Sequence, residues 1–103
     1  MSEWEIMRVI SRKALREFAA RHPRSKGPLD AWFAEVSRAK WESFAEVRAA
    51  YRSADVVGGN RVIFNIGGNK YRLVVKIAYR CGTVFVRFVG THDEYDTIDP
   101  ETI

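Results

Sequence analysis

The sequence has few of the residues that tie small domains together through disulfides or metal ions. It contains one cysteine, Cys81, and two histidines, His22 and His92, among 103 residues. A single cysteine excludes a disulfide within the chain, and two histidines so far apart match no zinc or haem spacing. We therefore expect no structural metal and no cofactor.

Long apolar runs are also lacking. No stretch approaches the roughly 18 apolar residues of a membrane helix, and the opening MSEWEIM has acidic residues where a signal peptide has basic ones. Proline and glycine occur singly or in pairs, without a linker or low-complexity tract. We expect one cytoplasmic domain over 1–103, with no membrane contact.

Carboxylates are outnumbered by cations. The chain has 17 Lys and Arg against 13 Asp and Glu, which gives a net charge of +4, and 47% of its residues are hydrophobic. At this length about 60 to 68% of the unfolded surface is buried on folding, enough for a single core. The surplus of positive charge fits a polyanionic partner but does not demonstrate one.

The first half of the chain has helical periodicity after a short strand. The expected elements are a strand at 6–10 and helices at 11–22, 25–40 and 43–53. Ser11 is placed as the N-cap of the first helix, and Ser43 with Glu46 forms an S-x-x-E capping box for the third. The sequence SADVVGG, 53–59, is expected to break the chain.

From Arg61 onward the hydrophobic period is two, which predicts strands at about 61–66, 69–79 and 84–90. The middle strand has one apolar face: Tyr71, Leu73, Val75, Ile77 and Tyr79. We expect that face to pack under the helices containing Phe18 and Phe33, and the opposite face to be open. The opposite face is mostly basic: Lys70, Arg72, Val74, Lys76, Ala78 and Arg80. The expected fold class is α+β.

The hairpin turns fix the expected register. A two-residue turn at Gly67 and Gly68 pairs Ile66 with Asn69 and puts Phe64 opposite Tyr71. A four-residue loop at 80–83 puts apolar residues of the next two strands opposite each other. The pairs expected there are Tyr79 with Val84, Ile77 with Val86, Val75 with Phe88, Lys76 with Arg87 and Arg72 with Thr91.

The basic face leads into THDEYD, 91–96, which has the groups that RNA phosphodiester cleavage needs. In that reaction the ribose 2′-oxygen attacks phosphorus, so a base, an acid and a cation are required. Histidine titrates near neutral pH, tyrosine can donate a proton, and arginine is permanently charged. The candidate catalytic residues are Arg72, His92 and Tyr95. The candidate RNA-binding residues are Lys70, Lys76, Arg87 and Arg61.

Each of these features also has a plain structural interpretation. Alternating Lys and Arg on a strand often form a solvated face that blocks aggregation, and THDEYD could be a polar tail. The scattered carboxylates near the C-terminus are more typical of a solvated turn than of a magnesium site. They are Asp93, Glu94, Asp96 and Asp99.

Two motifs resemble a known family. The run VIFNIGGNKYRLVVKIAY, 62–79, followed by a strand and THDEYD, is similar to the HigB toxins of type II toxin–antitoxin systems, within the RelE-like superfamily. SRKALREFAARHP and SADVV resemble the same family. The match begins near Met7, so residues 1–6 are expected to be an N-terminal extension.

The resemblance implies helices packed on a mostly antiparallel sheet and a metal-independent endoribonuclease, an mRNA interferase that cuts mRNA on the translating ribosome. It also implies a HigA-like helix-turn-helix antitoxin, with operator DNA bound only through the complex. Arg72, His92 and Tyr95 match family positions. Paired lysines of some relatives are replaced here by Ile63, Asn65 and Asn69, which leaves the general base open. The alternative is a non-catalytic RNA-binding or degenerate partner module on the same fold.

Overall fold

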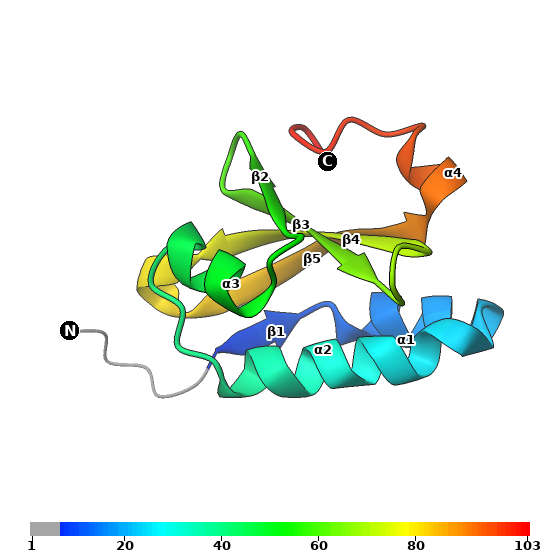
Figure 1. Ribbon diagram of the computed structural model, residues 1–103, viewed down its shortest axis with the longest axis horizontal. Coiled ribbons are helices and arrows are strands. Elements are labelled where there is room, and N and C mark those ends of the chain that lie inside the picture. Colours follow the sequence, from blue (N-terminus) through cyan, green and yellow to red (C-terminus); the bar gives the residue numbers. More distant parts are fainter. Residues whose placement is uncertain (1–6) are drawn as a thin grey trace.

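The computed structural model describes residues 7–103, and the expectation for residues 1–6 lies outside that part. A five-stranded sheet has the order β1-β5-β4-β3-β2, with β1 parallel to β5 and the other pairs antiparallel (Figure 1). The strands are β1 (Arg8–Ile10), β2 (Asp55–Val57), β3 (Arg61–Ile66), β4 (Tyr71–Ala78) and β5 (Thr83–Thr91). The helices are α1 (Arg12–Arg21), α2 (Lys26–Arg38), α3 (Phe44–Ala50) and α4 (His92–Tyr95).

Helices α1 and α2 lie along one side of the sheet, while α4 and the C-terminal segment lie on the other (Figure 1). The core is between the sheet and α1 and α2, where Leu73, Val75 and Ile77 of β4 are fully buried. Phe18 of α1 meets Tyr71 edge-on, with ring centroids 5.5 Å apart. Phe33 packs at the edge of this core, partly buried. The expected α+β fold is confirmed.

The three N-terminal helices form where the apolar periodicity predicts them, but two of their caps differ from expectation. Ser11 precedes α1 with a left-handed backbone (φ 77°), and its side chain makes no capping hydrogen bond. Ser43 likewise makes no side-chain cap for α3. The Glu46 carboxylate instead accepts a long hydrogen bond, 3.4 Å, from the Glu42 N–H, so the expected capping box is wrong.

The segment expected to break the chain contains a strand. Residues 55–57 form β2, with Val56 opposite Val62 of β3. The side chain of Val56 is half exposed because β2 is at the edge of the sheet. Three residues are too few to produce a detectable period-two pattern, so the strand was not predicted from sequence.

The first hairpin has a longer turn than expected. Gly67 and Gly68 both have positive φ, 65° and 78°, within a four-residue connection. Ile66 pairs with Tyr71, and Phe64 with Leu73, two residues away from the expected register. A shift of two preserves which side chains face the core, so the assignment of faces is correct although the pairs are wrong.

The second hairpin contains an irregularity that changes one face assignment. Val75 pairs with Val86, whereas Val74 pairs with Phe88, so Arg87 has no partner on β4 and is exposed. An extra residue of this kind is a β-bulge. Phe88 therefore lies on the face away from the main core, where it was not expected, and Gly90, not Thr91, is opposite Arg72. β4 also ends at Ala78, and Tyr79 begins a 3-10 turn.

Candidate active site

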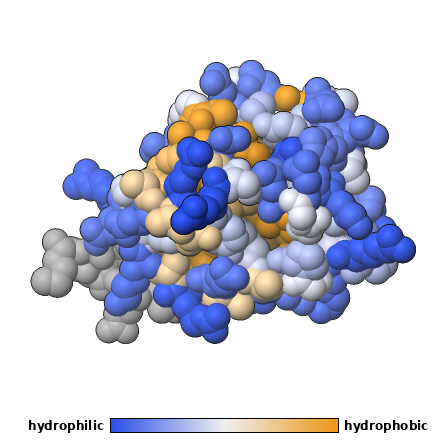
Figure 2. Space-filling view, in the orientation of Figure 1, coloured by the Kyte–Doolittle hydropathy of each residue, from blue (hydrophilic) through white to orange (hydrophobic). Residues whose placement is uncertain are grey.

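The sheet face opposite α1 and α2 is only partly open. Ile63 and Val74 lie on this face, are buried, and do not belong to the main core. They are covered because the chain after β5 turns back over the sheet, as α4 contacts both β5 and β4 (Figure 1). The rest of the visible surface is mostly hydrophilic (Figure 2). The cations of β4 are therefore next to a small apolar platform.

The THDEYD segment is a helical turn held by its own side chains. Thr91 caps α4: its hydroxyl accepts from the Glu94 N–H at 3.2 Å, and Glu94 Oε1 accepts from the Thr91 N–H at 2.8 Å. This reciprocal pair is a capping box. It sets the direction in which His92 and Tyr95 leave the end of β5.

The Glu94 carboxylate has further neighbours across the sheet edge. The hydrogen bond from the Thr91 N–H holds the pKa of Glu94 below its usual value, and His22 and Arg21 at the end of α1 lower it further. His22 itself stacks on Phe18, with ring centroids 4.4 Å apart. The turn that carries the candidate catalytic residues is thus in electrostatic contact with the end of α1.

Arg72 and Tyr95 are brought together. The Arg72 guanidinium carbon lies 5.8 Å from the centroid of the Tyr95 ring, and Nη1 donates to Asn69 Oδ1 at 2.9 Å. Partial burial raises the pKa of Tyr95 above its usual 10, and Arg72 acts in the opposite direction. The phenol is therefore protonated at neutral pH, beside a fixed positive charge.

Phe88 extends this group on the same face. Its ring centroid is 6.4 Å from that of Tyr95, and its ring lies across Gly90. A Cβ added at Gly90 would be 2.4 Å from Phe88 Cζ, so only glycine leaves room for the ring. The site face thus has two half-buried aromatic rings beside Arg72.

His92 begins the helical turn that Tyr95 ends, and it is half-buried. Within residues 7–103 its imidazole makes no hydrogen bond, and the contacts of this ring do not connect it directly to Arg72. Its placement in the same turn as Tyr95 follows from the chain, since residues three apart in a helix are on neighbouring positions of one side.

The four candidate RNA-binding cations divide into two groups. Lys70 and Arg87 are exposed, and Lys76 is half-buried on the site face of β4. Arg61 is different, because its guanidinium donates to the main-chain oxygen of Ile103 at 2.6 and 2.9 Å and to that of Gly59 at 3.2 Å. Its donors are largely used in holding the C-terminal segment.

The carboxylates of the segment 91–103 do not converge. In the part of the chain that the structure describes, no three Asp, Glu, His or Cys side chains are grouped as metal ligands would be. Glu94 is used by the capping box, and Asp99 accepts from the Glu101 N–H at 3.0 Å. No helix in residues 7–103 has the length and apolar character needed to cross a membrane.

Three functional features of this site were missed from sequence. Thr91 and Glu94 carry the S/T-x-x-E signal of a capping box, which was assigned at Ser43 and overlooked here. Asn69 was noted only as a departure from a lysine, although it holds the Arg72 guanidinium. Phe88 gave no signal, because only the bulge places it on this face.

Comparison with known proteins agrees with this geometry. The family model described as HigB toxin, a RelE-like toxic component of a toxin–antitoxin system, matches residues 25–98, more than half of the chain. The chain is also 29% identical over 92 residues to the mRNA interferase toxin HigB of Escherichia coli (strain K12), covering 87% of this chain and 88% of that protein. The mRNA interferase HigB proteins of Escherichia coli O157:H7 and Shigella flexneri match to the same extent. The chain belongs to the HigB toxin family.

Proposed function

We propose that this HigB toxin cleaves mRNA on the translating ribosome, without a metal ion, at the face formed by Arg72, His92 and Tyr95. As a member of its family the chain is the toxic component of a toxin–antitoxin system, and the related mRNA interferases support endoribonuclease activity. The observation that carries the proposal is the Arg72 guanidinium held beside the Tyr95 ring.

Arg72 has the properties needed to stabilise the transition state. Its charge is permanent, and the hydrogen bond to Asn69 fixes one nitrogen while the others are free to face a phosphate. Negative charge grows on the phosphorane oxygens as the 2′-oxygen attacks, so a cation already in place lowers the barrier. Gly90 opposite Arg72 leaves room for a phosphate near the strand.

Tyr95 and His92 supply the proton transfers in this proposal. Because the raised pKa keeps the Tyr95 phenol protonated, Tyr95 is suited to donate a proton to the leaving 5′-oxygen or a hydrogen bond to the substrate. His92 then takes the proton of the 2′-hydroxyl, since an unprotonated imidazole is a competent base near neutral pH. The atoms balance without a metal or a cofactor.

Binding of the RNA is assigned to Lys70, Lys76 and Arg87, which contact phosphates by charge alone. Arg61 is left out because its donors are used within the chain. The proposed partner is a HigA-like helix-turn-helix antitoxin, and operator DNA is bound only through that complex. Action on translated mRNA places the chain in the cytoplasm.

The products of cleavage test the chemistry. Ribosome-bound mRNA should be cut to a 2′,3′-cyclic phosphate and a 5′-hydroxyl, and a 2′-deoxy nucleotide at the cleaved position should abolish the cut. A phosphorothioate at the same position should not be rescued by Mn²⁺ or Cd²⁺. Cleavage of the deoxy substrate would contradict attack by the 2′-oxygen, and thiophilic rescue would contradict metal independence.

The alternative is a module that binds RNA without cutting it. The same positive charge would serve a binder, but a binder does not need Asn69 to fix Arg72 beside Tyr95. If purified chain binds ribosomes with wild-type salt dependence and no new RNA ends are formed, the binding module is the correct description.

A further inference from the structure

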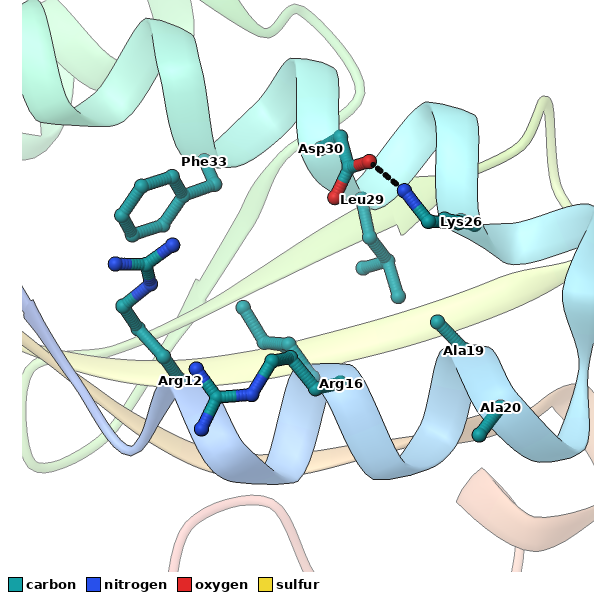
Figure 3. Close-up of a pocket in the computed structure, with 9 residues that line it drawn as sticks. Arg12, Arg16, Ala19, Ala20, Lys26, Leu29, Asp30 and Phe33 are labelled. Atoms are coloured by element: carbon teal, nitrogen blue, oxygen red, sulfur yellow. Dashed lines mark hydrogen bonds and ion pairs between the residues drawn. The ribbon is translucent and has the colours of Figure 1, made fainter.

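A groove lies between α1 and α2, on the helical layer and so on the opposite side of the sheet from the Arg72 face (Figures 1 and 3). Its volume is about 370 Å³. Leu15 and Ala19 of α1 and Leu29 and Phe33 of α2 form its apolar lining. This volume is within the range of about 300 to 1,000 Å³ typical of binding pockets.

Cations surround this apolar lining. Arg12 and Arg16 stand on the α1 side and Lys26 on the α2 side (Figure 3). Lys26 is paired with Asp30 at 2.8 Å, whereas within residues 7–103 neither guanidinium lies within 4 Å of a carboxylate. The edge of the groove therefore has an excess of positive charge that the described part of the chain does not neutralise.

The lining does not suit a nucleic acid. Leucine and alanine offer no planar surface on which a base could stack, and the Phe33 ring is already covered by the Arg12 guanidinium, 4.0 Å from the ring centroid. An apolar lining between two helices with a cationic edge suits an amphipathic protein segment, whose apolar side chains enter the groove while its carboxylates meet the arginines.

We propose that this groove is the docking site of the antitoxin, and that the antitoxin enters it with an acidic amphipathic segment. The proposal goes beyond the cleavage chemistry, because it depends on membership in a toxin family and on the groove and not on Arg72, His92 or Tyr95. A segment bound here leaves the Arg72 face uncovered, so anchoring of the antitoxin and occlusion of the site are separate functions of that partner.

The test uses two changes at the groove and two matched controls on the same helix. Arg16→Glu reverses a charge at the edge, and Ala20→Phe fills the space, since Ala20 is an exposed lining residue. Lys13→Glu makes the same charge reversal where the side chain is 81% exposed and outside the groove. Ala14→Phe adds the same ring at an exposed position that does not line it.

The probe is the antitoxin encoded beside the toxin gene, titrated calorimetrically into each full-length variant. We expect R16E and A20F to weaken binding by at least about tenfold, with K13E and A14F within about twofold of wild type. All four variants should still cleave ribosome-bound mRNA at the wild-type rate, and cells making R16E should no longer be protected by the antitoxin. Wild-type affinity in both groove variants would overturn the proposal.

Other occupants give different results. Weaker ribosome binding by R16E and A20F, with unchanged antitoxin affinity, would assign the groove to the ribosome. A change in the sedimentation of the toxin alone would assign it to a second copy. A chain that begins at Met7 serves as a further control because residues 1–6 include Glu3, Trp4 and Glu5. A gain of about tenfold in antitoxin affinity on removing them would show that they compete for the groove, against the proposal.

A measurement that does not depend on substitution keeps the test clear of folding defects. Hydrogen exchange of the amides of α1 and α2 should slow when antitoxin is added, by more than in α3, which does not line the groove. Protection confined to β4, β5 and α4 would place the antitoxin on the opposite face and would overturn the proposal.

Discussion

Arg72 on the fourth strand lies with its guanidinium carbon 5.8 Å from the ring centroid of Tyr95, in the helical turn that follows the fifth strand. The two side chains meet because Gly90 is opposite Arg72 and Thr91 starts the turn directly after it. The hairpin thus delivers a cation, and the capping box delivers a phenol, to one point on the sheet. This relationship makes the geometry of α4 a determinant of activity.

The capping box should affect catalysis more than it affects the fold. Glu94→Ala removes the acceptor of the Thr91 N–H and loosens the turn that holds Tyr95. We expect single-turnover cleavage to fall by about tenfold with little change in RNA affinity, because misplacement of a catalytic group costs rate. Asp93→Ala, at an exposed neighbour outside the box, is the control. Glu94→Gln, which keeps an acceptor oxygen, should restore much of the rate.

Glu94 also gives a signed dependence of stability on pH. Its pKa is lowered in the folded chain, so its contribution to stability is present above the usual glutamate pKa of 4.5 and is lost as the pH falls through the lower folded value. In urea unfolding from pH 7 to pH 3, the difference in stability between wild type and Glu94→Gln should shrink at acid pH. A difference that grows on acidification would show that the direction of the shift is wrong.

Gly90 should be intolerant of a side chain. In Gly90→Ala the new methyl would be 2.4 Å from Phe88 Cζ, so the ring must move, at a cost of about 1 to 3 kcal/mol in the free energy of unfolding. Gly27→Ala is the matched control, since nothing lies within 4 Å of its added Cβ. Adding Phe88→Leu to Gly90→Ala should recover part of the lost stability. If Gly90→Ala and Gly27→Ala unfold alike, the ring does not lie across Gly90.

The phenol of Tyr95 should respond to Arg72. Burial raises its pKa above 10, whereas the Arg72 charge lowers it, so Arg72→Ala should raise the pKa further. The measurement is the ultraviolet titration of each protein minus that of its Tyr95→Phe counterpart. Arg80→Ala, at an exposed residue beyond the end of β4, should leave the pKa unchanged. A fall in the Tyr95 pKa in Arg72→Ala would mean that the two groups do not interact.

The sequence allowed the fold and the faces of the sheet to be predicted, because both follow from periodicity. The alternation around Leu73 survives a register error of two residues, so the core was assigned correctly even though Phe64 pairs with Leu73 and not with Tyr71. Pairing depends on turn length, and a Gly-Gly pair fits turns of more than one length. Periodicity therefore determined the faces but left the pairs open.

The site was less predictable because it depends on two local irregularities. The bulge at Arg87 moves Phe88 from the core to the site face, and no pattern in the strand indicates it. The turn of α4 does have a sequence signal, Thr91 and Glu94, but polar residues after a strand resemble a tail when the helix is only one turn long. That Arg72 lies near Tyr95 could be expected only from the resemblance.

The most direct test of the proposed site is single-turnover cleavage of ribosome-bound mRNA by Arg72→Ala, His92→Ala and Tyr95→Phe, with circular dichroism to confirm folding. We expect losses of about 10² to 10³ for Arg72→Ala and about 10² to 10⁴ for the other two. Lys70→Ala and Arg87→Ala should instead weaken binding and reduce its salt dependence. Wild-type cleavage rates in both His92→Ala and Tyr95→Phe would contradict the account and would make THDEYD a polar tail.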